Sequence, residues 1–492
     1  MRLSKSSFIR GVQCEKMLYL DKHHSDLREE SSVSKEAIFE QGTNVGLLAQ
    51  DLFKGGYDAS PDDYSRISKS LINTQKAIEN GESIIYEATF EFNGLLSAID
   101  ILVKENNQWK AYEVKSSTSV SETYVIDAAV QYYTIVKSGL ELSDISLVLI
   151  NSEYVRKSEI DLNDFFKIIS VKNEVLNQQS ILPDKIDFLK NTINKKEIPT
   201  KNIGVHCNEP YDCDFKAHCW KHIPEYSIFD ISRLKQKKKF KLYNQGIITF
   251  DQLKNSDMKF SSSQKIQINS EVHKSSIIKK DLIKNFTDSL SYPLYFLDFE
   301  TILPAIPLFD NCKPFQQVVF QYSLHVQKEK ESNLSHYEYL APSDIDPREA
   351  FIEKLIEDCG SKGDIIVYNI SFERGRLNEL ISIYPKYKEQ LNNIINRMKD
   401  LMIPFQKKWF YTPEMKGSYS IKYVLPALVS DLSYDQLAIK DGGTASNTFL
   451  SMVNNTFDGN EVEERKNLLE YCEMDSFAMV KILDKLFQVV KK

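Results

Sequence analysis

The sequence predicts an α/β protein with two sheet-bearing domains. Residues 84–115 contain three strand patterns with a period of two, followed by a helix pattern and a further apolar strand. Residues 294–301 read as a buried strand, and an apolar-periodic segment running to Leu486 reads as a helix. We therefore expect domains at residues 1–220 and 291–492, joined by a small helical bridge at 221–290.

Length and composition are those of an ordinary globular protein, with 492 residues, 42% hydrophobic and 27% charged. No run of about 18 apolar residues occurs and the first residues lack an apolar signal core, so we expect a cytoplasmic protein that does not span a membrane. The net charge of −7 argues against a protein that coats nucleic acid with its whole surface. A local basic groove would still suffice for binding.

In the first domain, the patterns at 84–92, 95–104 and 109–115 predict three consecutive strands, and Asn93-Gly94 is a strong hairpin signal. A helix around 127–136 and a buried strand at 145–150 follow. A meander, a helix and a further strand make an α/β core.

Polar residues interrupt these strands on one face. Asp100 lies inside an apolar strand, and Glu113 and Lys115 flank Val114 on the same face of another. Gln131 on the next helix faces the same way if that helix packs on the sheet. The acids can bind Mg²⁺, and the lysine can stabilise charge that develops on a phosphate or orient water. Taken alone, Glu113 and Lys115 also fit an exposed salt pair.

The order Asp100, Glu113, Lys115 and Gln131-Tyr-Tyr resembles the RecB-like branch of the PD-(D/E)xK nucleases. The resemblance implies a restriction-endonuclease-like fold in which these four residues are catalytic and the two acids hold a metal. The branch commonly has a histidine in its first helix, after a glycine. Here Gly46 follows Gly42-Thr-Asn-Val, and the candidates to replace that ligand are acidic: Glu87 and Glu40.

Three cysteines form a dense cluster after this core, spaced by five residues and five: Cys207, Cys213 and Cys219. Thiolates at this density bind iron–sulfur clusters or zinc, for which His206 and His218 offer nitrogen ligands, or they remain unliganded core thiols. With the distant Cys14, the pattern resembles the iron–sulfur RecB-like exonucleases, including the CRISPR-associated ones. That resemblance implies a 4Fe-4S cluster held by all four cysteines.

The bridge is basic, because residues 229–286 contain thirteen Lys and Arg against five Asp and Glu. Residues 242–253, centred on Gly246, resemble a helix–hairpin–helix element, whose backbone amides can contact a phosphate backbone. Basic charge with interleaved aromatic residues suits non-specific strand binding. A solvated helical linker is the alternative.

The strand at 294–301 carries two acids on one face. Asp298 and Glu300 alternate with Leu297 and Phe299, which point the other way. Two carboxylates side by side in an apolar strand repel one another and are difficult to desolvate. A pair of Mg²⁺ or Mn²⁺ ions is the simplest way to neutralise them.

Two later segments complete this pattern: Glu373 follows an apolar strand and Asn-Ile-Ser-Phe, and Tyr471 and Asp475 share one face of the last helix. Together they resemble the DnaQ-like 3′→5′ exonucleases that have four acids and a tyrosine. The resemblance implies a ribonuclease H-like mixed sheet and four metal ligands, with Tyr471 positioning the attacking water. The ligands would be Asp298, Glu300, Glu373 and Asp475.

The family usually has Asp where this chain has Glu373, and Asp400 is the reserve candidate. Lys422, near the start of a serine-capped helix, is a candidate phosphate contact. Residues 441–444, Asp-Gly-Gly-Thr, read as a turn near the substrate.

The whole chain therefore resembles bacterial proteins that fuse an iron–sulfur RecB-like domain to a DnaQ-like domain. We expect a metal-dependent nuclease with two centres that acts on DNA in repair or anti-phage defence. An RNA-processing exonuclease and a catalytically inert scaffold that binds strands are the alternatives. The chain contains no Gly-x4-Gly-Lys-Ser/Thr loop, so any unwinding would need a partner.

Overall fold

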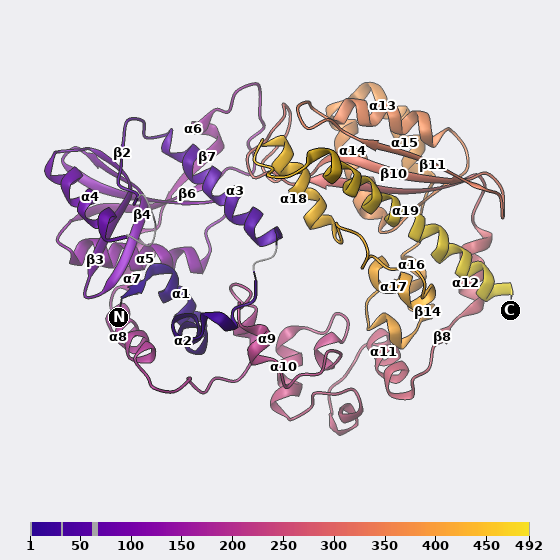
Figure 1. The fold of residues 1–492 in the computed structure, drawn as a ribbon, viewed down its shortest axis with the longest axis horizontal. Coiled ribbons are helices and arrows are strands. Elements are labelled where there is room, and N and C mark those ends of the chain that lie inside the picture. Colours follow the sequence, from indigo (N-terminus) through magenta and orange to yellow (C-terminus); the bar gives the residue numbers. More distant parts are fainter. Residues whose placement is uncertain (1, 31–32, 62–66, 492) are drawn as a thin grey trace. The chain divides into compact units, whose positions relative to one another are not determined.

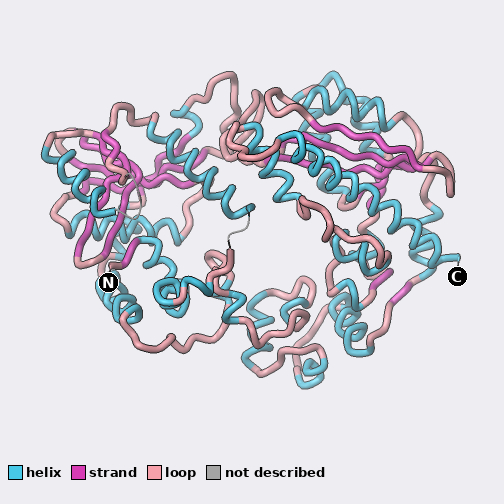
Figure 2. The backbone as a smooth tube through the Cα atoms, viewed as in Figure 1, coloured by secondary structure: helices cyan, strands magenta, loops and turns pink. Residues whose placement is uncertain are grey.

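A computed structural model describes residues 2–30, 33–61 and 67–491 (Figure 1). The chain forms two compact units: unit 1 contains Met1–His222 and Pro304–Gln316, and unit 2 contains Ile223–Leu303 and Gln317–Lys492. The short segment 304–316 thus belongs to unit 1, although unit 2 precedes and follows it in the sequence. Each unit has its own sheet, as the magenta strands in Figure 2 show.

Unit 1 is mixed α/β. Its strands are β1 (Leu3–Ser4), β2 (Tyr57–Asp58), β3 (Ile84–Phe92), β4 (Leu95–Glu105), β5 (Gln108–Lys115), β6 (Leu142–Ile150) and β7 (Phe166–Ser170). Its helices are α1 (Lys5–Gln13), α2 (Glu15–His23), α3 (Val33–Gln50), α4 (Ile67–Glu79), α5 (Glu122–Lys137), α6 (Leu162–Phe165), α7 (Lys172–Gln178), α8 (Leu182–Ile193) and α9 (Lys216–Cys219).

The sheet of unit 1 has the order β2-β3-β4-β5-β6-β7, and β1 pairs in parallel with β4. The pairs β3–β4, β4–β5 and β6–β7 are antiparallel, whereas β5–β6 is parallel. The three predicted strands are confirmed to within one residue at their ends. Asn93 and Gly94 both have positive φ, 47° and 69°, as the tight hairpin turn between β3 and β4 requires.

Both faces of this sheet are covered, so that alternate residues of β6 enter different cores. Leu147 and Leu149 pack in the core that α1, α4 and α5 share. Val148 and Ile150 pack in the second core, with residues of α3 and with Ala305 from the segment 304–316. The polar residues of β4 and β5 are therefore held on a rigid, doubly covered sheet.

Unit 2 is also mixed α/β. Its strands are β8 (Ile277–Ile278), β9 (Leu294–Ile302), β10 (Val318–Gln327), β11 (Leu334–Leu340), β12 (Asp364–Val367), β13 (Met398–Asp400) and β14 (Phe410–Tyr411). Its helices are α10 (Gln236–Asn244), α11 (Ser262–His273), α12 (Lys280–Asp288), α13 (Arg348–Cys359), α14 (Ile370–Ile383), α15 (Lys388–Asn396), α16 (Ile403–Gln406), α17 (Ile421–Leu428), α18 (Gly442–Val453) and α19 (Glu461–Lys491).

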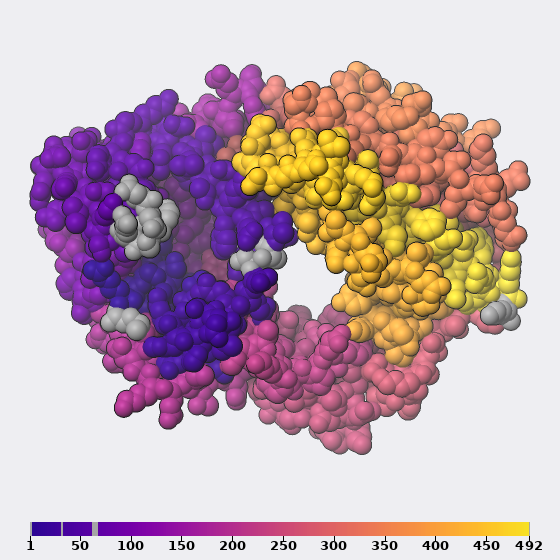
Figure 3. Space-filling model, in the orientation of Figure 1, coloured from indigo at the N-terminus to yellow at the C-terminus, as the bar shows by residue number. Residues whose placement is uncertain are grey.

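The main sheet of unit 2 has the order β11-β10-β9-β12-β13. Strands β9, β10 and β11 are antiparallel neighbours, while β12 and β13 run parallel to β9. Leu297 and Phe299 of β9 enter a core with α13, α14 and α15. The opposite face of β9 meets α18 and α19, so the predicted alternation along this strand is confirmed. The end of α19 reaches the surface of unit 2, where its yellow atoms are visible (Figure 3).

The predicted bridge lies mainly within unit 2, since Ile228, Leu242 and Ile247 belong to a small hydrophobic core of that unit. Gly246 has a φ of 78° and ends the turn after α10. The amides of Ile248 and Thr249, two and three residues later, both donate to the side-chain oxygen of Gln252. These two hairpin amides are thus already bonded within the chain.

Within the described parts of the chain, no helix is both long and apolar enough to cross a bilayer.

Candidate metal centres

The sheet of unit 2 brings three acids together. Asp298 and Glu300 come from the central strand β9, and Asp475 comes from α19. One carboxylate oxygen from each lies within 4.8 Å of the other two. Glu300 and Asp475 are buried and Asp298 is partly buried. Residues almost 180 positions apart therefore form one group of potential ligands.

Burial and the repulsion between neighbouring carboxylates raise the pKa values of two acids in this group. Burial, together with Asp475 and Glu300, raises the pKa of Asp298 well above its usual value. Burial and Asp475 likewise raise the pKa of Glu300. Carboxylates this close favour either shared protons or a bound cation.

Two tyrosines and a lysine border the acids. Burial raises the pKa of Asp475, and hydrogen bonds from Tyr434 and Tyr471 oppose that rise. The Tyr434 hydroxyl donates to Asp475 Oδ1 at 2.5 Å. Lys422 lies over both rings, with Nζ 5.6 Å from the centre of Tyr434 and 5.3 Å from that of Tyr471, and it donates to the carbonyl of Lys440. The predicted residues Tyr471 and Lys422 thus meet at this group.

Glu373 lies on α14, just outside the tight group. It is buried, and its charge is among the causes that raise the pKa of Asp298. Its Oε2 has no hydrogen-bond partner among the described residues. A buried carboxylate oxygen without a donor is a suitable ligand for a cation. Glu373 therefore lies next to the group, but its carboxylate is not within 4.8 Å of all three acids.

The reserve candidate Asp400 has a different environment. Its carboxylate accepts hydrogen bonds from the backbone amides of Asn369, Ile370 and Met402. Two of these amides lie at the start of α14, where unpaired donors need an acceptor. Asp400 therefore anchors the helix that carries Glu373.

The segment at 441–444 is the start of α18 rather than an isolated turn. Asp441 is the N-cap and accepts from the amide of Thr444 at 2.9 Å. A Cβ atom on Gly442 would lie 3.4 Å from Oε2 of Glu300, so the first turn of α18 abuts this acid. Cys472 also borders the group, since its sulfur is 3.8 Å from Asp298 Oδ2.

Sequence reasoning missed Tyr434 and Cys472 as neighbours of the acids, and it placed Gly442 near the substrate only as part of a turn. Tyr434 and Gly442 lie in a stretch without hydrophobic periodicity, so no pattern placed them beside β9. Cys472 could have been found, because it falls between Tyr471 and Asp475 on α19.

Unit 1 brings its four predicted residues together as well. Asp100 accepts from the amide of Val114 at 2.6 Å. Glu113 accepts from Lys115 at 2.8 Å and from Gln131 at 2.5 Å, and Gln131 also donates to the carbonyl of Ala98. Burial and the charge of Glu113 raise the pKa of Asp100 well above its usual value.

Two further residues complete this centre and were not predicted. Lys5 donates to Glu113 Oε1 at 2.6 Å, and Asp127 accepts from Lys115 at 2.9 Å. Burial would raise the pKa of Glu113, but Lys115 and Lys5 outweigh it and lower the pKa to about 2. The pairing of β1 with β4 positions Lys5 at the start of α1. That short parallel pairing leaves no periodic signal in the sequence.

Of the two acids considered as replacements for the absent histidine, Glu87 is the one near the centre. Burial and the charge of Glu113 raise the pKa of Glu87 to about 7. Glu40 is exposed on α3. A Cβ atom on Gly42 or Gly46 would meet no atom within 4 Å, so this face of α3 is open.

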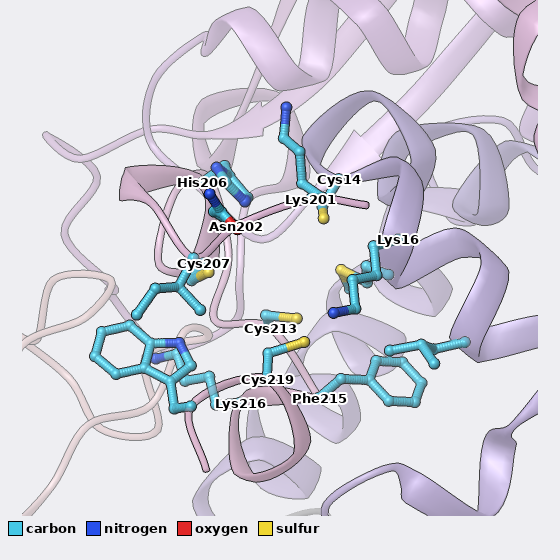
Figure 4. A pocket seen from close by; sticks show the side chains of 14 residues that line it. Cys14, Lys16, Lys201, Asn202, His206, Cys207, Cys213, Phe215, Lys216 and Cys219 are labelled. Atoms are coloured by element: carbon cyan, nitrogen blue, oxygen red, sulfur yellow. The ribbon is translucent and has the colours of Figure 1, made fainter. Parts of the chain in front are cut away.

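The four predicted cysteines line one pocket of unit 1. Cys14 lies between α1 and α2, and the other three come from the segment around α9. Figure 4 shows the sulfur atoms of Cys14, Cys207, Cys213 and Cys219 directed toward the same space. His206 also lines the pocket, whereas His218 is not among the lining residues.

The spacing of these sulfurs bears on the choice of metal. A zinc ion with thiolates at about 2.3 Å would draw their sulfurs to about 3.8 Å from one another. Among the described residues, no three of these cysteines form a group whose ligand atoms lie within 4.8 Å. A cluster of several irons spans a wider set of thiolates than a single zinc ion does.

Both units thus bring acidic side chains of their sheets close together, beside Lys5 and Lys115 in unit 1 and beside Tyr434 and Tyr471 in unit 2. Residues 295–420 match a family model described as a domain of unknown function, DUF2779. The matched stretch includes Asp298, Glu300 and Glu373 but ends before Asp475.

The curated relatives are mycoplasmal proteins. Uncharacterized protein MG366 of Mycoplasma genitalium is 28% identical over 230 residues, covering 42% of this chain and 34% of that protein. Uncharacterized protein UU173 of Ureaplasma parvum is 32% identical over 223 residues, covering 40% and 31%. The MG366 homolog of Mycoplasma pneumoniae is 28% identical over 218 residues, covering 40% and 33%. The chain thus aligns with about one third of the length of these relatives.

Proposed function

We propose that this chain is a divalent-metal-dependent nuclease whose principal centre lies in unit 2 and removes nucleotides from the 3′ end of a DNA strand. The observation that carries the proposal is the convergence of Asp298, Glu300 and Asp475, whose ligand oxygens lie within 4.8 Å of one another. The strand order β11-β10-β9-β12-β13, with the first acids on the central strand, supports the ribonuclease H-like fold that the DnaQ-like resemblance implies.

The donor set suits Mg²⁺ or Mn²⁺, because all its members are carboxylates. Glu373 would complete the set from α14, where its unpartnered oxygen is buried. When bound, a pair of such ions supplies the Lewis acidity that activates water and neutralises charge on the scissile phosphate.

The remaining residues act on the water and the strand. Burial, with Asp475, raises the pKa of Tyr471, so this hydroxyl stays protonated and can hold the attacking water by a hydrogen bond. Lys422 carries a positive charge at the rim and would contact a phosphate oxygen of the strand. Tyr434 holds Asp475 in place as a positioning residue.

Unit 1 supports a second nuclease centre in the same proposal. Asp100 and Glu113 would hold a metal, Lys115 would stabilise charge on the phosphate, and Gln131 fixes the orientation of Glu113. The four cysteines would hold a 4Fe-4S cluster with a structural role, with zinc as the alternative.

The test is degradation of end-labelled single- and double-stranded DNA and RNA by the purified full chain with Mg²⁺ or Mn²⁺. Asp298→Ala should lower 3′ release at least about 100-fold, because it removes a ligand from the tight group. Asp288→Asn, a substitution on the exposed face of α12, is the matched control.

Lys115→Ala separates the two centres, since cleavage that survives Asp298→Ala but not Lys115→Ala belongs to unit 1. Equal degradation by wild type and Asp298→Ala would remove the unit 2 centre from the proposal. Degradation of RNA alone would favour the RNA-processing alternative. Absence of degradation, with retained strand binding, would favour a binding scaffold.

A further inference from the structure

A second group of potential ligands lies on the same sheet of unit 2, apart from the acids. His325 on β10 and His336 on β11 are direct cross-strand partners, with ring centres 4.5 Å apart. Glu473 on α19 faces them, and its Oε1 is 3.9 Å from Nδ1 of His336. One ligand atom from each of the three residues lies within 4.8 Å of the others.

Two serines fix both rings. His325 Nδ1 is 2.8 Å from the hydroxyl of Ser476, and His336 Nε2 is 2.9 Å from the hydroxyl of Ser323. The two serine hydroxyls are themselves 2.7 Å apart. Each imidazole is thus held through one nitrogen, which leaves Nε2 of His325 and Nδ1 of His336 to take a metal. Ligating histidines are commonly oriented by a hydrogen bond from their other nitrogen.

We infer that His325, His336 and Glu473 bind one transition-metal ion of the zinc class. Two imidazole nitrogens and one carboxylate are a common donor set for zinc, with a fourth position left open to water. His325 is buried, His336 is partly buried and the side chain of Glu473 is half exposed, so solvent reaches one side of the group. Burial and the neighbouring His336 lower the pKa of His325 to about 4, which keeps this ring in the neutral form that metals need.

The two groups of unit 2 would select different ions. Mg²⁺ prefers oxygen ligands and leaves imidazole pairs to softer metals. The histidine site would also fasten α19 to β10 and β11, because each of these elements contributes one ligand. Glu473 precedes Asp475 by two residues, so the zinc-class ion would hold the helix that carries an acid of the other group. Binding of this ion by His325, His336 and Glu473 does not require nuclease activity.

Cobalt(II) is the probe, added to the full chain after a chelator has removed labile divalent ions. Nitrogen and oxygen ligands give weak visible d–d bands, whereas thiolates add an intense charge-transfer band that would report binding in the cysteine pocket. We expect the d–d bands of the tightest-bound ion to saturate at one equivalent per chain, because imidazole ligands bind cobalt more tightly than the carboxylate groups do. His336→Ala should weaken this binding about 100-fold and Glu473→Gln about tenfold.

His273→Ala, at the exposed end of α11, is the matched control and should titrate as wild type does. Zinc should raise the melting temperature of wild type and of His273→Ala but not of His336→Ala. A cooperative melt of metal-free His336→Ala near the melting temperature of the metal-free wild type shows that this variant is folded. The inference is overturned if wild type and His336→Ala give the same cobalt titration, or if Asp298→Asn abolishes the bands and His336→Ala does not.

Discussion

The carboxylate of Asp298 shows how a single residue couples stability to pH. Its folded-state pKa is raised by burial and by three neighbouring acids, Asp475, Glu300 and Glu373. A group with a raised pKa contributes stability below its ordinary pKa, and this contribution is lost as the pH rises through the folded-state value. The metal-free protein should therefore become less stable as the pH rises above the ordinary aspartate pKa of about 4.

Asp298→Asn should raise the melting temperature of the metal-free protein at about pH 8, because it removes one of the repelling charges. The gain should grow as the pH rises above the ordinary aspartate pKa of about 4, because the unfolded chain then loses the proton that the folded carboxyl retains. The same variant should lose most of the stabilisation that Mg²⁺ gives to wild type. Thermal melts with and without Mg²⁺ measure both effects, and a loss of stability at every pH would contradict this prediction.

A substitution of Lys5 tests how a charged contact in unit 1 couples stability to pH. Lys5→Met removes one of the two ammonium groups that Glu113 Oε1 accepts from, and should destabilise the unit by about 1–3 kcal/mol near neutral pH. The pKa of Glu113 lies at about 2, below its ordinary value, so the stability from this carboxylate is present above the ordinary pKa and lost as the pH falls. The difference between variant and wild type should therefore shrink toward acid pH.

Urea unfolding at several pH values measures that difference. Lys22→Met on the exposed side of α2 is the control, and should change stability by less than about 0.5 kcal/mol. If the control and Lys5→Met gave equal losses, the contact with Glu113 would carry no stability.

At the scale of elements, the start of α18 sets the position of Glu300. A Cβ atom at Gly442 would reach 3.4 Å from Glu300 Oε2, and the γ-methyl groups of valine would extend further toward it. Gly442→Val should therefore displace this carboxylate and raise the Mg²⁺ concentration needed for half-maximal activity about tenfold, while Gly442→Ala has a smaller effect.

Gly375→Val on α14 is the matched control, because a Cβ atom there would meet no atom within 4 Å. Titration of activity against Mg²⁺ distinguishes the three variants. A Gly442→Val enzyme with an unchanged Mg²⁺ requirement would show that α18 does not control Glu300.

At the scale of the whole molecule, the cysteine pocket joins the start of unit 1 to its end. Cys14 lies 193 residues before Cys207 in the chain, and both line the same pocket. Cys213→Ser should abolish the visible absorption of a bound cluster and destabilise unit 1, while the proposed 3′ exonuclease activity of unit 2 remains.

Absorption after anaerobic purification, iron and zinc analysis, and limited proteolysis with mass spectrometry measure these outcomes. His206→Ala is the control and should keep the absorption if the ligands are the four thiolates. Zinc without iron, lost in His206→Ala, would support the zinc alternative.

A feature of this structure could be predicted where its sequence pattern lies in neighbouring residues. The bounds of strands β3, β4 and β5 were predicted almost to the residue. Neighbouring residues show both the alternation of apolar and polar side chains and the Asn93-Gly94 turn. The alternation along β9 also placed Asp298 and Glu300 on one face. Tyr434 and Lys5 could not be predicted as neighbours of acids, since Tyr434 lies in a loop and Lys5 is positioned by a two-residue strand that precedes it. The pair Gly442-Gly443 suggested a turn, and only the cap at Asp441 explains why a helix begins there.

Because of the segment 304–316, neither unit is formed by one continuous stretch of the chain. The covalent path passes from one unit to the other at residues 222–223, 303–304 and 316–317. A gene fragment that stops after residue 222 would encode unit 1 without Ala305 and its neighbours, and would leave part of the second core uncovered. The two halves of this protein are therefore not interchangeable modules that recombination could exchange with a single crossover.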